Sequence, residues 1–578
     1  MPRGSSRTLR LLAPWAVADD ELSRRAGLIL CGSLVVVLAQ PFVPIRQFVL
    51  RADDAFYYFG VAAHFPALGA WSFDTIHTTN GVQPLWEALL SALAQILSWL
   101  GVSSPDTLAR IFVGVSVLLL FASAMLLFDL LRRTVSVGTG VAAAGAFVFP
   151  LGAVWARAWG MESALYALLL IATIAYFHLV VRARQDRVSA AVLGVLLGLT
   201  ALARLNAATL VPVLLLAFLL EGPAEGRRSR LRLALVATVA AILVTLPYFA
   251  ADYAITGHMT PISGTVKSID TRNYLRQHHL GTRFSPSFVA DVYHDYGGSV
   301  SWFLRSRAGD GLWIVGDQAV TTNAPRWRWL GVALAVFALA PLLLGRPRAW
   351  FRFLGERFGR LRPFAYVLVF ALLDAAVSIA LYPTELAYAM VRWWFVPQEL
   401  VIVVVVATFA VASIGYMARR LLSARWVLAL ATVGLAALLV FQAQQSFRFF
   451  WSDPVQYRDW NQSYNDEMYR AAGWLRTHAP ANALVGSWNA GVLGYYARQR
   501  VEDLDGLING YTIVPYLRSN RTVDLIEHER LDYLADISGE FTRRHPDVLR
   551  KLRLEKVYSH YSRFARRDYL IYKVLGPA

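Results

Sequence analysis

The sequence predicts a polytopic α-helical membrane protein that carries a small soluble unit at its C-terminal end. The mean hydropathy is +0.44, and 56% of the residues are hydrophobic while only 16% are charged, against about a quarter charged in soluble domains. Apolar runs of the length that a hydrocarbon core of about 30 Å requires recur along the chain. The net charge of +17 gathers in short loops between these runs, which favours a lipid bilayer as partner and excludes a nucleic-acid surface.

Eleven apolar runs are predicted to span the membrane. They lie at 27–47, 108–131, 136–155, 161–181, 188–204, 206–221, 232–251, 327–345, 363–382, 395–416 and 424–442. Arginines precede the first run and follow every second one, as at Arg132–Arg133 and Arg227–Arg228. Because positively charged loops stay in the cytoplasm, we expect a cytoplasmic N-terminus and an extracytoplasmic C-terminus. The preference for Arg over Lys indicates a bacterial protein, and hence the inner membrane.

The segment 84–102 is a further apolar stretch that competes for the status of a span. Counting it as one would place the later basic loops outside the cell, against the charge rule. The segment is amphipathic and carries Glu87 near its start. We therefore expect a juxtamembrane helix at the outer interface.

This topology leaves two long loops and a tail on the outer side. Outer loop one is 48–107 and the second long loop is 252–326. Residues 1–442 then form the transmembrane domain, and 443–578 return to a soluble composition, long enough for one small α/β domain. Within the tail, "EMYRAAGWLRTHAP" predicts an amphipathic helix, and "ALVGSWNAGVLGYY" predicts a strand, a turn and a second short element.

Two adjacent acids, Asp53 and Asp54, stand where the chain leaves the first apolar run. Adjacent carboxylates repel each other, and partial burial raises a carboxylate pKa, so one of them suits a proton acceptor. The alternative is a helix cap, since Asp54 precedes a helical pattern. A cap accounts for one of the two acids, for which we favour Asp54, and the residues themselves leave open which aspartate is the base.

Further ionisable residues fall at the predicted outer ends of spans. Glu162 stands beside Gly160, at the start of the run 161–181, where an acid in the first turn also suits the helix dipole. Lys267, Arg392 and, more weakly, Arg204 are lone bases on outer segments, where they could grip a phosphate. Asp374 lies in the middle of a span, which marks it as a functional hypothesis.

These motifs together resemble the GT-C superfamily of integral-membrane glycosyltransferases, in particular its bacterial mannosyl-, arabinofuranosyl- and aminoarabinosyltransferase-like branches. The matching stretches are "RADDAFYYFGVAAHF", "WGMESALYALLL", "ALARLNAATL", "DYAITGHMTPISGTVKS" and "YAMVRWWFVP", and the tail stretch that begins "AAGWLRTHAP". One departure is Asn206, where the pattern leads us to expect an acid. The resemblance covers most of the chain and rests on the ordered set, since each motif alone is weak.

The resemblance implies an inverting transferase that uses a polyprenyl-phosphate-linked sugar and an acceptor hydroxyl on the outer face. The acceptor is a glycan, a glycolipid or a protein. The implied roles are catalysis by Asp53 and Asp54, binding of acceptor or sugar by Glu162, His64, Tyr57, Tyr58 and Trp86, and binding of the donor phosphate by Lys267, Arg392 and Arg204.

The sequence also bears on cofactors and on alternative functions. Cys31 is the only cysteine, so the chain has no internal disulfide and no cysteine-based metal site. We expect no cofactor. The first alternative is a transferase that uses a pyrophosphate-linked oligosaccharide and a divalent ion, Mg²⁺ or Mn²⁺, held by carboxylates. The others are a transporter or flippase for lipid-linked sugars, although no inverted repeat is visible, and a catalytically inactive glycan-binding scaffold.

Overall fold

A computed structural model describes most of the protein. It covers residues 53–148, 160–220, 226–277, 347–381, 396–421, 460–562 and 567–578, with isolated positions between 21 and 44 and between 423 and 433. The predicted spans 327–345, most of 27–47 and 424–442, and the turn that carries Arg392 lie outside the described residues.

Four helices in the described ranges are long and apolar enough to cross a membrane. They are α5 (Pro105–Thr134), the continuous stretch from α8 (Ser163–Tyr176) to α9 (Arg182–Arg184), α12 (Arg227–Thr256) and most of α19 (Val396–Leu421). The pair α17 (Pro347–Gly359) and α18 (Ala365–Leu381), bent by 45°, adds a fifth if it is counted as one span. Shorter apolar helices occupy Arg187–Ala203, which is α10, and Leu205–Leu220. The chain is thus a helical membrane protein, and the total of eleven spans stays a prediction.

The helix α5 illustrates how the sequence sets the ends of a span. Pro105 opens α5 in the first turn, where its missing N–H costs no hydrogen bond, and Asp106 follows it. Arg132 and Arg133 stand in the last turn. Acids at the N-terminus and bases at the C-terminus both favour the helix dipole.

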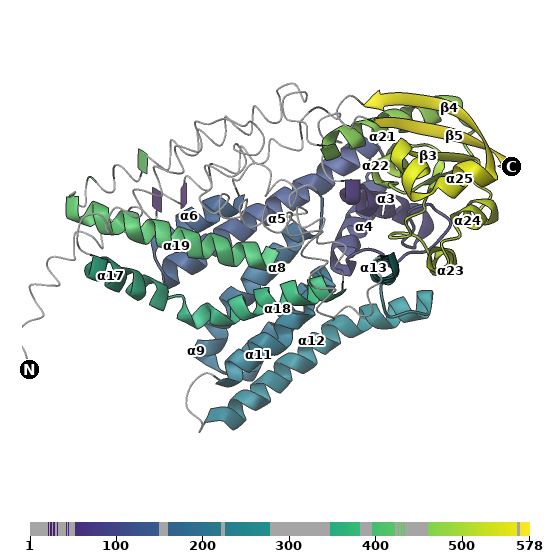
Figure 1. Ribbon diagram of the computed structural model, residues 1–578. Helices are drawn as coiled ribbons and strands as arrows, with labels where there is room; N and C mark the ends of the chain where they lie inside the picture. The colour runs from purple at the N-terminus through teal and green to yellow at the C-terminus, as the bar shows by residue number, and fades with distance from the viewer. Residues whose placement is uncertain are drawn as a thin grey trace, which may run out of the picture.

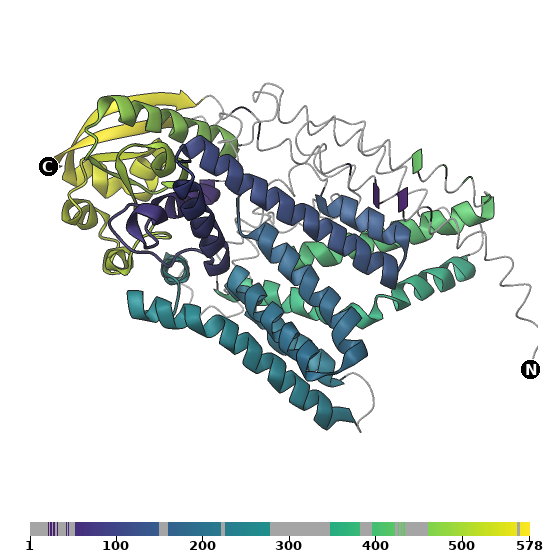
Figure 2. The same ribbon diagram turned by 180° about the vertical axis from the view of Figure 1, so that it is seen from behind.

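Two glycines allow α10 and α12 to approach each other closely. A Cβ at Gly194 would overlap the backbone of Ala237, and one at Gly198 would lie 2.8 Å from the Cβ of Val244. Small residues four apart on one face are typical of membrane helices packed at short distance. The pair forms one side of the bundle (Figure 2).

The arginines at the helix ends lie on one side of the bundle. The arginine-bearing ends of α5 and α9 and the start of α12 lie at the end of the bundle far from the β-sheet (Figures 1 and 2). There Arg360 Nη1 donates to the carbonyl of Val135 at 2.7 Å. The arginines therefore gather at one end of the bundle, and the orientation expected from loop charge stays a prediction.

Outer loop one forms two helices at the opposite end, next to the sheet. These are α3 (Asp53–Leu68) and α4 (Pro84–Trp99), which pack against each other. The segment 84–102 is therefore a 16-residue helix, too short for the span length of about 20 residues. Glu87 in its first turn is fully buried, and Ser91 Oγ donates to its Oε1 at 3.2 Å.

The tail begins with α21 (Trp460–His478) and builds a five-stranded sheet in the order β2-β1-β3-β5-β4. The strands are β1 (Leu484–Ser487), β2 (Arg500–Asp503), β3 (Tyr533–Ile537), β4 (Leu552–Ser562) and β5 (Arg567–Pro577). β1 pairs in parallel with β2 and β3, while β5 pairs antiparallel with β3 and β4. The short helix α22 (Gly491–Tyr496) follows β1. We call this mixed α/β part, residues 460–578, the tail unit.

The tail unit and the helical part share a hydrophobic core. One cluster of buried side chains runs from Phe112 on α5 through Phe56 and Phe59 on α3 to Val492 and Leu493 on α22. The predicted boundary at 442/443 therefore does not separate two independent cores. Packing fixes α3 against both parts at once.

Candidate functional site

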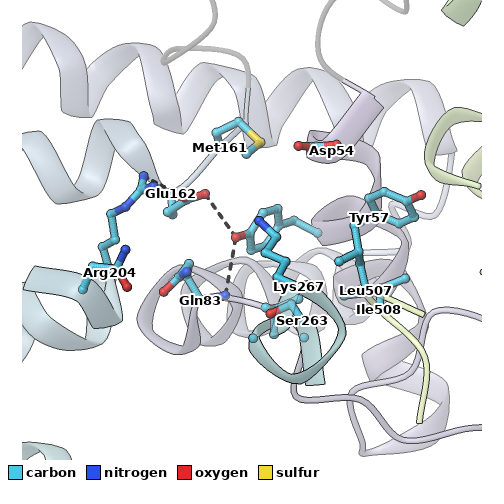
Figure 3. A pocket seen from close by; sticks show the side chains of 15 residues that line it. Asp54, Tyr57, Gln83, Met161, Glu162, Arg204, Ser263, Lys267, Leu507 and Ile508 are labelled. Carbon is cyan, nitrogen blue, oxygen red and sulfur yellow. Dashed lines mark hydrogen bonds and ion pairs between the residues drawn. The ribbon is translucent and has the colours of Figure 1, made fainter. Parts of the chain in front are cut away.

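A cavity lies where α3, the start of α8, the junction of α10 with the 3-10 helix η3 (Leu205–Thr209), and the tail unit meet. Its empty volume, which includes solvent at the mouth, is about 820 Å³. Its lining comprises Asp54, Tyr57 and Tyr58 of α3, the turn 81–83, Met161 and Glu162, Arg204 and Asn206, Ser263, Gly264 and Lys267 of α13 (Ile262–Gln277), and Leu507 and Ile508 of the tail unit. Figure 3 shows these side chains around one opening. Six separate stretches of the chain thus supply one polar site.

A buried ion pair forms one wall of the cavity. Arg204 Nη1 lies 3.2 Å from Glu162 Oε1, with side chains only 7% and 4% exposed. The guanidinium also lies over the Tyr166 ring, 5.9 Å from its centroid. Because each charge is nearly withdrawn from water, each depends on its partner for stabilisation. The pair holds the Glu162 carboxylate in a fixed orientation.

Tyr58 and Gln83 complete a closed chain of hydrogen bonds around this ion pair. Tyr58 Oη donates to Glu162 Oε2 at 3.1 Å and accepts from the Gln83 backbone N–H at 3.4 Å. The Gln83 side chain in turn accepts from the N–H of Leu205, next to Arg204, at 3.1 Å. Figure 3 marks part of this chain. Both oxygens of Glu162 are therefore engaged, and the wall is built to be rigid.

The backbone before Glu162 needs a glycine. Gly160 has φ +91°, and a Cβ there would overlap the ring of Phe59. The Gly160 carbonyl accepts the indole N–H of Trp86 at 2.8 Å. Trp86 is fully buried, so its expected contact with a sugar is wrong. The inward face of α4 is used instead to hold the turn that presents Glu162.

The two adjacent aspartates of α3 point to different partners. Asp54 is exposed and lines the cavity. Asp53 faces the tail unit, where its Oδ1 accepts the N–H of Val492 at 2.7 Å. Burial is the main reason that the pKa of Asp53 rises to about 8, and the charges of Asp54, Asp536 and Asp503 add to it. Asp53 is thus the residue engaged by a helix end and Asp54 is the one at the cavity, and which of the two is the base stays a prediction.

Lys267 reaches the cavity from α13, and Asn80 anchors that helix. Asn80 Nδ2 donates to both carboxylate oxygens of Asp252, at 2.9 and 3.0 Å, and its Oδ1 accepts the N–H of Ile262 at 2.8 Å. Asn80 is only 2% exposed. One buried side chain therefore ties outer loop one to the end of α12 and to the first residue of α13, and so places Lys267.

The remaining expected site residues have separate outcomes. Tyr57 lines the cavity, and its Oη also accepts the N–H of Ala490 at 2.9 Å. His64 stands further along α3, where its Nδ1 lies 3.3 Å from the carbonyl oxygen of Ser72 and it takes no part in the cavity lining. The expected role of His64 in binding therefore stays a prediction without support from this cavity. Arg392 lies outside the described residues.

Sequence reasoning missed several residues at the cavity. Gln83 directly precedes Pro84, the first residue of α4, and a polar residue at that place signals a helix start. Leu507 and Ile508 carry no signal of this kind, because only the docking of the tail unit brings them to the opening. Asn206, noted as a departure from the family pattern, does line the cavity.

A divalent ion does not fit the donors that the described residues offer. Such ions need several oxygen ligands, and no cluster of three or more His, Cys, Asp or Glu side chains gathers for one in the described ranges. Glu162 is occupied by Arg204 and Tyr58.

Comparison with solved structures gives matches along nearly the whole chain. ArnT from Cupriavidus metallidurans, bound to undecaprenyl phosphate, matches with a TM-score of 0.51 at 14% identity, over 94% of this chain and 97% of that one. Archaeal oligosaccharyltransferase AglB from Archaeoglobus fulgidus, in complex with an inhibitory peptide and a dolichol-phosphate, matches with a TM-score of 0.50 at 14% identity, over 94% and 74%. The chain has the GT-C fold. The resemblance seen in the sequence is thereby confirmed at the level of the fold.

A second comparison concerns the C-terminal part of the chain. A family model described as a domain of unknown function (DUF8728) matches residues 456–572, which is nearly the whole tail unit. No curated protein matches the chain. The tail unit therefore corresponds to a recognised domain family whose function is unknown.

Proposed function

We propose that this protein is an inverting glycosyltransferase that moves a sugar from a polyprenyl-phosphate-linked donor to an acceptor hydroxyl. The observation that carries the proposal is the convergence of Asp54, Glu162, Arg204 and Lys267 on one cavity of a GT-C fold. ArnT is described with undecaprenyl phosphate and AglB with dolichol-phosphate. Both names support a lipid phosphate as the donor's carrier.

The chemistry follows from the charges around the cavity. The acceptor oxygen attacks the anomeric carbon from the side opposite the phosphate, the bond from that carbon to the phosphate oxygen breaks, and Asp54 takes the hydroxyl proton. The electron pair leaves with the polyprenyl phosphate, whose negative charge increases as the bond breaks. Lys267 stabilises that charge where it develops. Glu162, held by Tyr58 and Arg204, accepts hydrogen bonds from hydroxyls of the sugar or acceptor.

The proposal includes the site's location on the outer face of the bacterial cytoplasmic membrane. The arginine-bearing helix ends lie at the end of the bundle far from the tail unit (Figure 1), whereas the cavity is lined in part by the tail unit itself. In a Cys31→Ala background, a thiol introduced as Arg500→Cys is expected to react with an impermeant reagent on intact cells. One introduced as Gly355→Cys is expected to react only after lysis. The reverse pattern would overturn the orientation.

Reconstitution tests the reaction itself. The full chain in lipid vesicles is given a panel of synthetic polyprenyl-phosphate sugars, and release of polyprenyl phosphate is measured with and without candidate acceptors. Asp54→Asn is expected to lower kcat by about 10²- to 10⁴-fold, the range for loss of a general base. Asp524→Asn, an exposed site paired with Arg521 at 3.4 Å in the tail unit, is the matched control. Equal turnover by Asp54→Asn and the wild type would rule out the proposed base.

The same assay separates the metal-dependent alternative. A transferase acting on pyrophosphate-linked oligosaccharides through Mg²⁺ or Mn²⁺ would lose activity in EDTA and regain it with added metal. Because Arg204 and Tyr58 already occupy the Glu162 carboxylate, we expect EDTA to leave turnover of the monophosphate-linked sugar unchanged. Recovery of activity when Mn²⁺ is added to the EDTA-treated enzyme would support the metal-dependent alternative.

A further inference from the structure

The tail unit places an edge of its sheet against α3. The parallel strands β1, β2 and β3 end at Ser487, Asp503 and Ile537, so their carboxyl ends lie at one edge. In open α/β sheets this edge is where ligands bind, because loops and helix N-termini gather there. In this protein α3 lies beside the sheet and packs against α22, the helix that follows β1 (Figure 1). Its first turn therefore lies at the edge where other sheets of this kind bind ligands.

Two hydrogen bonds join α3 to the turn after β1. The N–H of Val492 donates to Asp53 Oδ1 at 2.7 Å, and the N–H of Ala490 donates to Tyr57 Oη at 2.9 Å. Between them, a Cβ at Gly491 would lie 2.5 Å from the Asp53 carbonyl oxygen and 2.6 Å from its Oδ1. The glycine is therefore required for the close approach. We call residues 53, 57 and 490–492 the clamp.

Aromatic packing continues the clamp along α3. Phe56 lies against Tyr495 and Tyr496, with ring centroids 5.5 and 5.7 Å apart. Tyr495 Oη donates to the carbonyl of Pro105 at 2.7 Å, at the start of α5. The tail unit thus grips α3 and the neighbouring span together.

Helical geometry connects the clamp to the cavity. Residues four apart lie on one face of a helix, so Asp53 and Tyr57 share the face toward the tail unit. Asp54 and Tyr58 share the adjacent face, about 100° around the axis at 3.6 residues per turn. A small rotation of α3 that broke the Asp53–Val492 bond would turn Asp54 away from its present position at the cavity.

We propose that Asp53 is a positioning residue, and that the tail unit sets the catalytic geometry by holding α3 through the Asp53–Val492 and Tyr57–Ala490 hydrogen bonds. This inference rests on the proposed function, in which Asp54 is the base. It gives the tail unit a defined part in the reaction, separate from any contact with substrate. It also explains why two adjacent acids occur at this point of the chain.

Asp53→Ala tests the clamp from the side of α3. In the full chain, hydrogen exchange measured by mass spectrometry is expected to increase in the peptide covering 488–497. The kcat is expected to fall by about 10- to 100-fold, the range for misplacement by about 1 Å, while the donor KM changes less than about 3-fold. The ionisation limb of the pH–rate profile should remain, because Asp54 is still present. Asp53→Asn keeps an oxygen for the Val492 N–H and should restore most of kcat.

Gly491→Ala tests the clamp from the side of the tail unit and should reproduce both effects. Gly473→Ala is the control, since the nearest atom to its Cβ would be Arg476 Nη2 at 3.6 Å. Unchanged exchange of 488–497 in Asp53→Ala would overturn the clamp and leave the proposed function standing. Loss of the ionisation limb in Asp53→Asn would make Asp53 the base instead. A wild type that turns over no donor would defeat the proposed function and the catalytic part of this inference, while the exchange result would still decide whether the contact holds.

Discussion

Tyr58 and Glu162, 104 residues apart in the sequence, meet in the cavity wall, where the phenol donates to the carboxylate at 3.1 Å. The same carboxylate accepts from Arg204 at 3.2 Å. Two donors on its two oxygens fix the plane of the carboxylate, so substrate hydroxyls meet an acceptor whose orientation is already set.

Removal of one hydroxyl from this wall should affect activity. Tyr58→Phe keeps the ring but leaves Glu162 with one donor, and we expect kcat/KM to fall by about 5- to 30-fold, or about 1–2 kcal/mol, for a lost hydrogen bond to a charged group. Tyr166→Phe is the matched control. Tyr166 is 1% exposed and also lies beside Arg204, and its hydroxyl has no hydrogen-bond partner within the described structure. Equal kinetics of the two variants would contradict the role given to Tyr58.

Removing one member of the Glu162–Arg204 ion pair should destabilise the folded protein. Arg204→Met leaves a buried carboxylate without its cation, and we expect the free energy of unfolding to fall by about 3–5 kcal/mol. The double variant Glu162→Gln/Arg204→Met removes both charges and should recover part of the loss. Thermal unfolding of the purified protein in detergent measures all three. A double variant no more stable than Arg204→Met would show that the charges are not coupled.

The turn before Glu162 offers a test of backbone geometry. Gly160→Ala adds a methyl group to a residue with φ +91° and against the Phe59 ring, so it carries both conformational strain and overlap. Gly69→Ala also has a positive φ, +64°, but no atom lies within 4 Å of the new Cβ. We expect Gly69→Ala to cost about 1–2 kcal/mol and Gly160→Ala clearly more, measured by thermal unfolding. Similar costs for both would refute the contact with Phe59.

Asp53 should make the stability of the protein depend on pH. Its pKa is about 8 in the folded chain against an ordinary value of 3.8, so between these values the folded state holds a proton that the unfolded state has lost. The contribution of Asp53 to stability is therefore greatest below about pH 4 and decreases as the pH rises to about 8. Asp53→Asn cannot ionise and lacks this dependence.

The measurement is the difference in Tm between Asp53→Asn and the wild type, at several pH values from 5 to 9. The difference should grow in favour of the variant up to about pH 8 and then level off. The acids that face Asp53, namely Asp54 on α3, Asp503 at the end of β2 and Asp536 on β3, are present in both proteins and largely cancel. A difference that does not change with pH would contradict the shifted pKa.

Local patterns along the chain were enough to predict the class of this protein and the approximate place of its candidate site. Hydropathy and loop arginines define a helical membrane protein, because the length of an apolar run and the charge beside it are local properties of the chain. The stretches around Asp53–Asp54, Glu162, Arg204 and Lys267 were all recognised from the family pattern, and all four reach one cavity.

Which residue of each stretch lines the cavity depends on tertiary packing. Asp53 and Asp54 are neighbours with the same chemistry, and their roles differ because α3 turns one of them toward Val492, 439 residues away. Trp86 reads from the sequence as a sugar platform, yet it is fully buried and holds the Gly160 carbonyl. Leu507 and Ile508 reach the opening only through the docking of the tail unit. The direction of a side chain depends on how a helix is rotated against partners distant in the sequence, and no local pattern encodes that rotation.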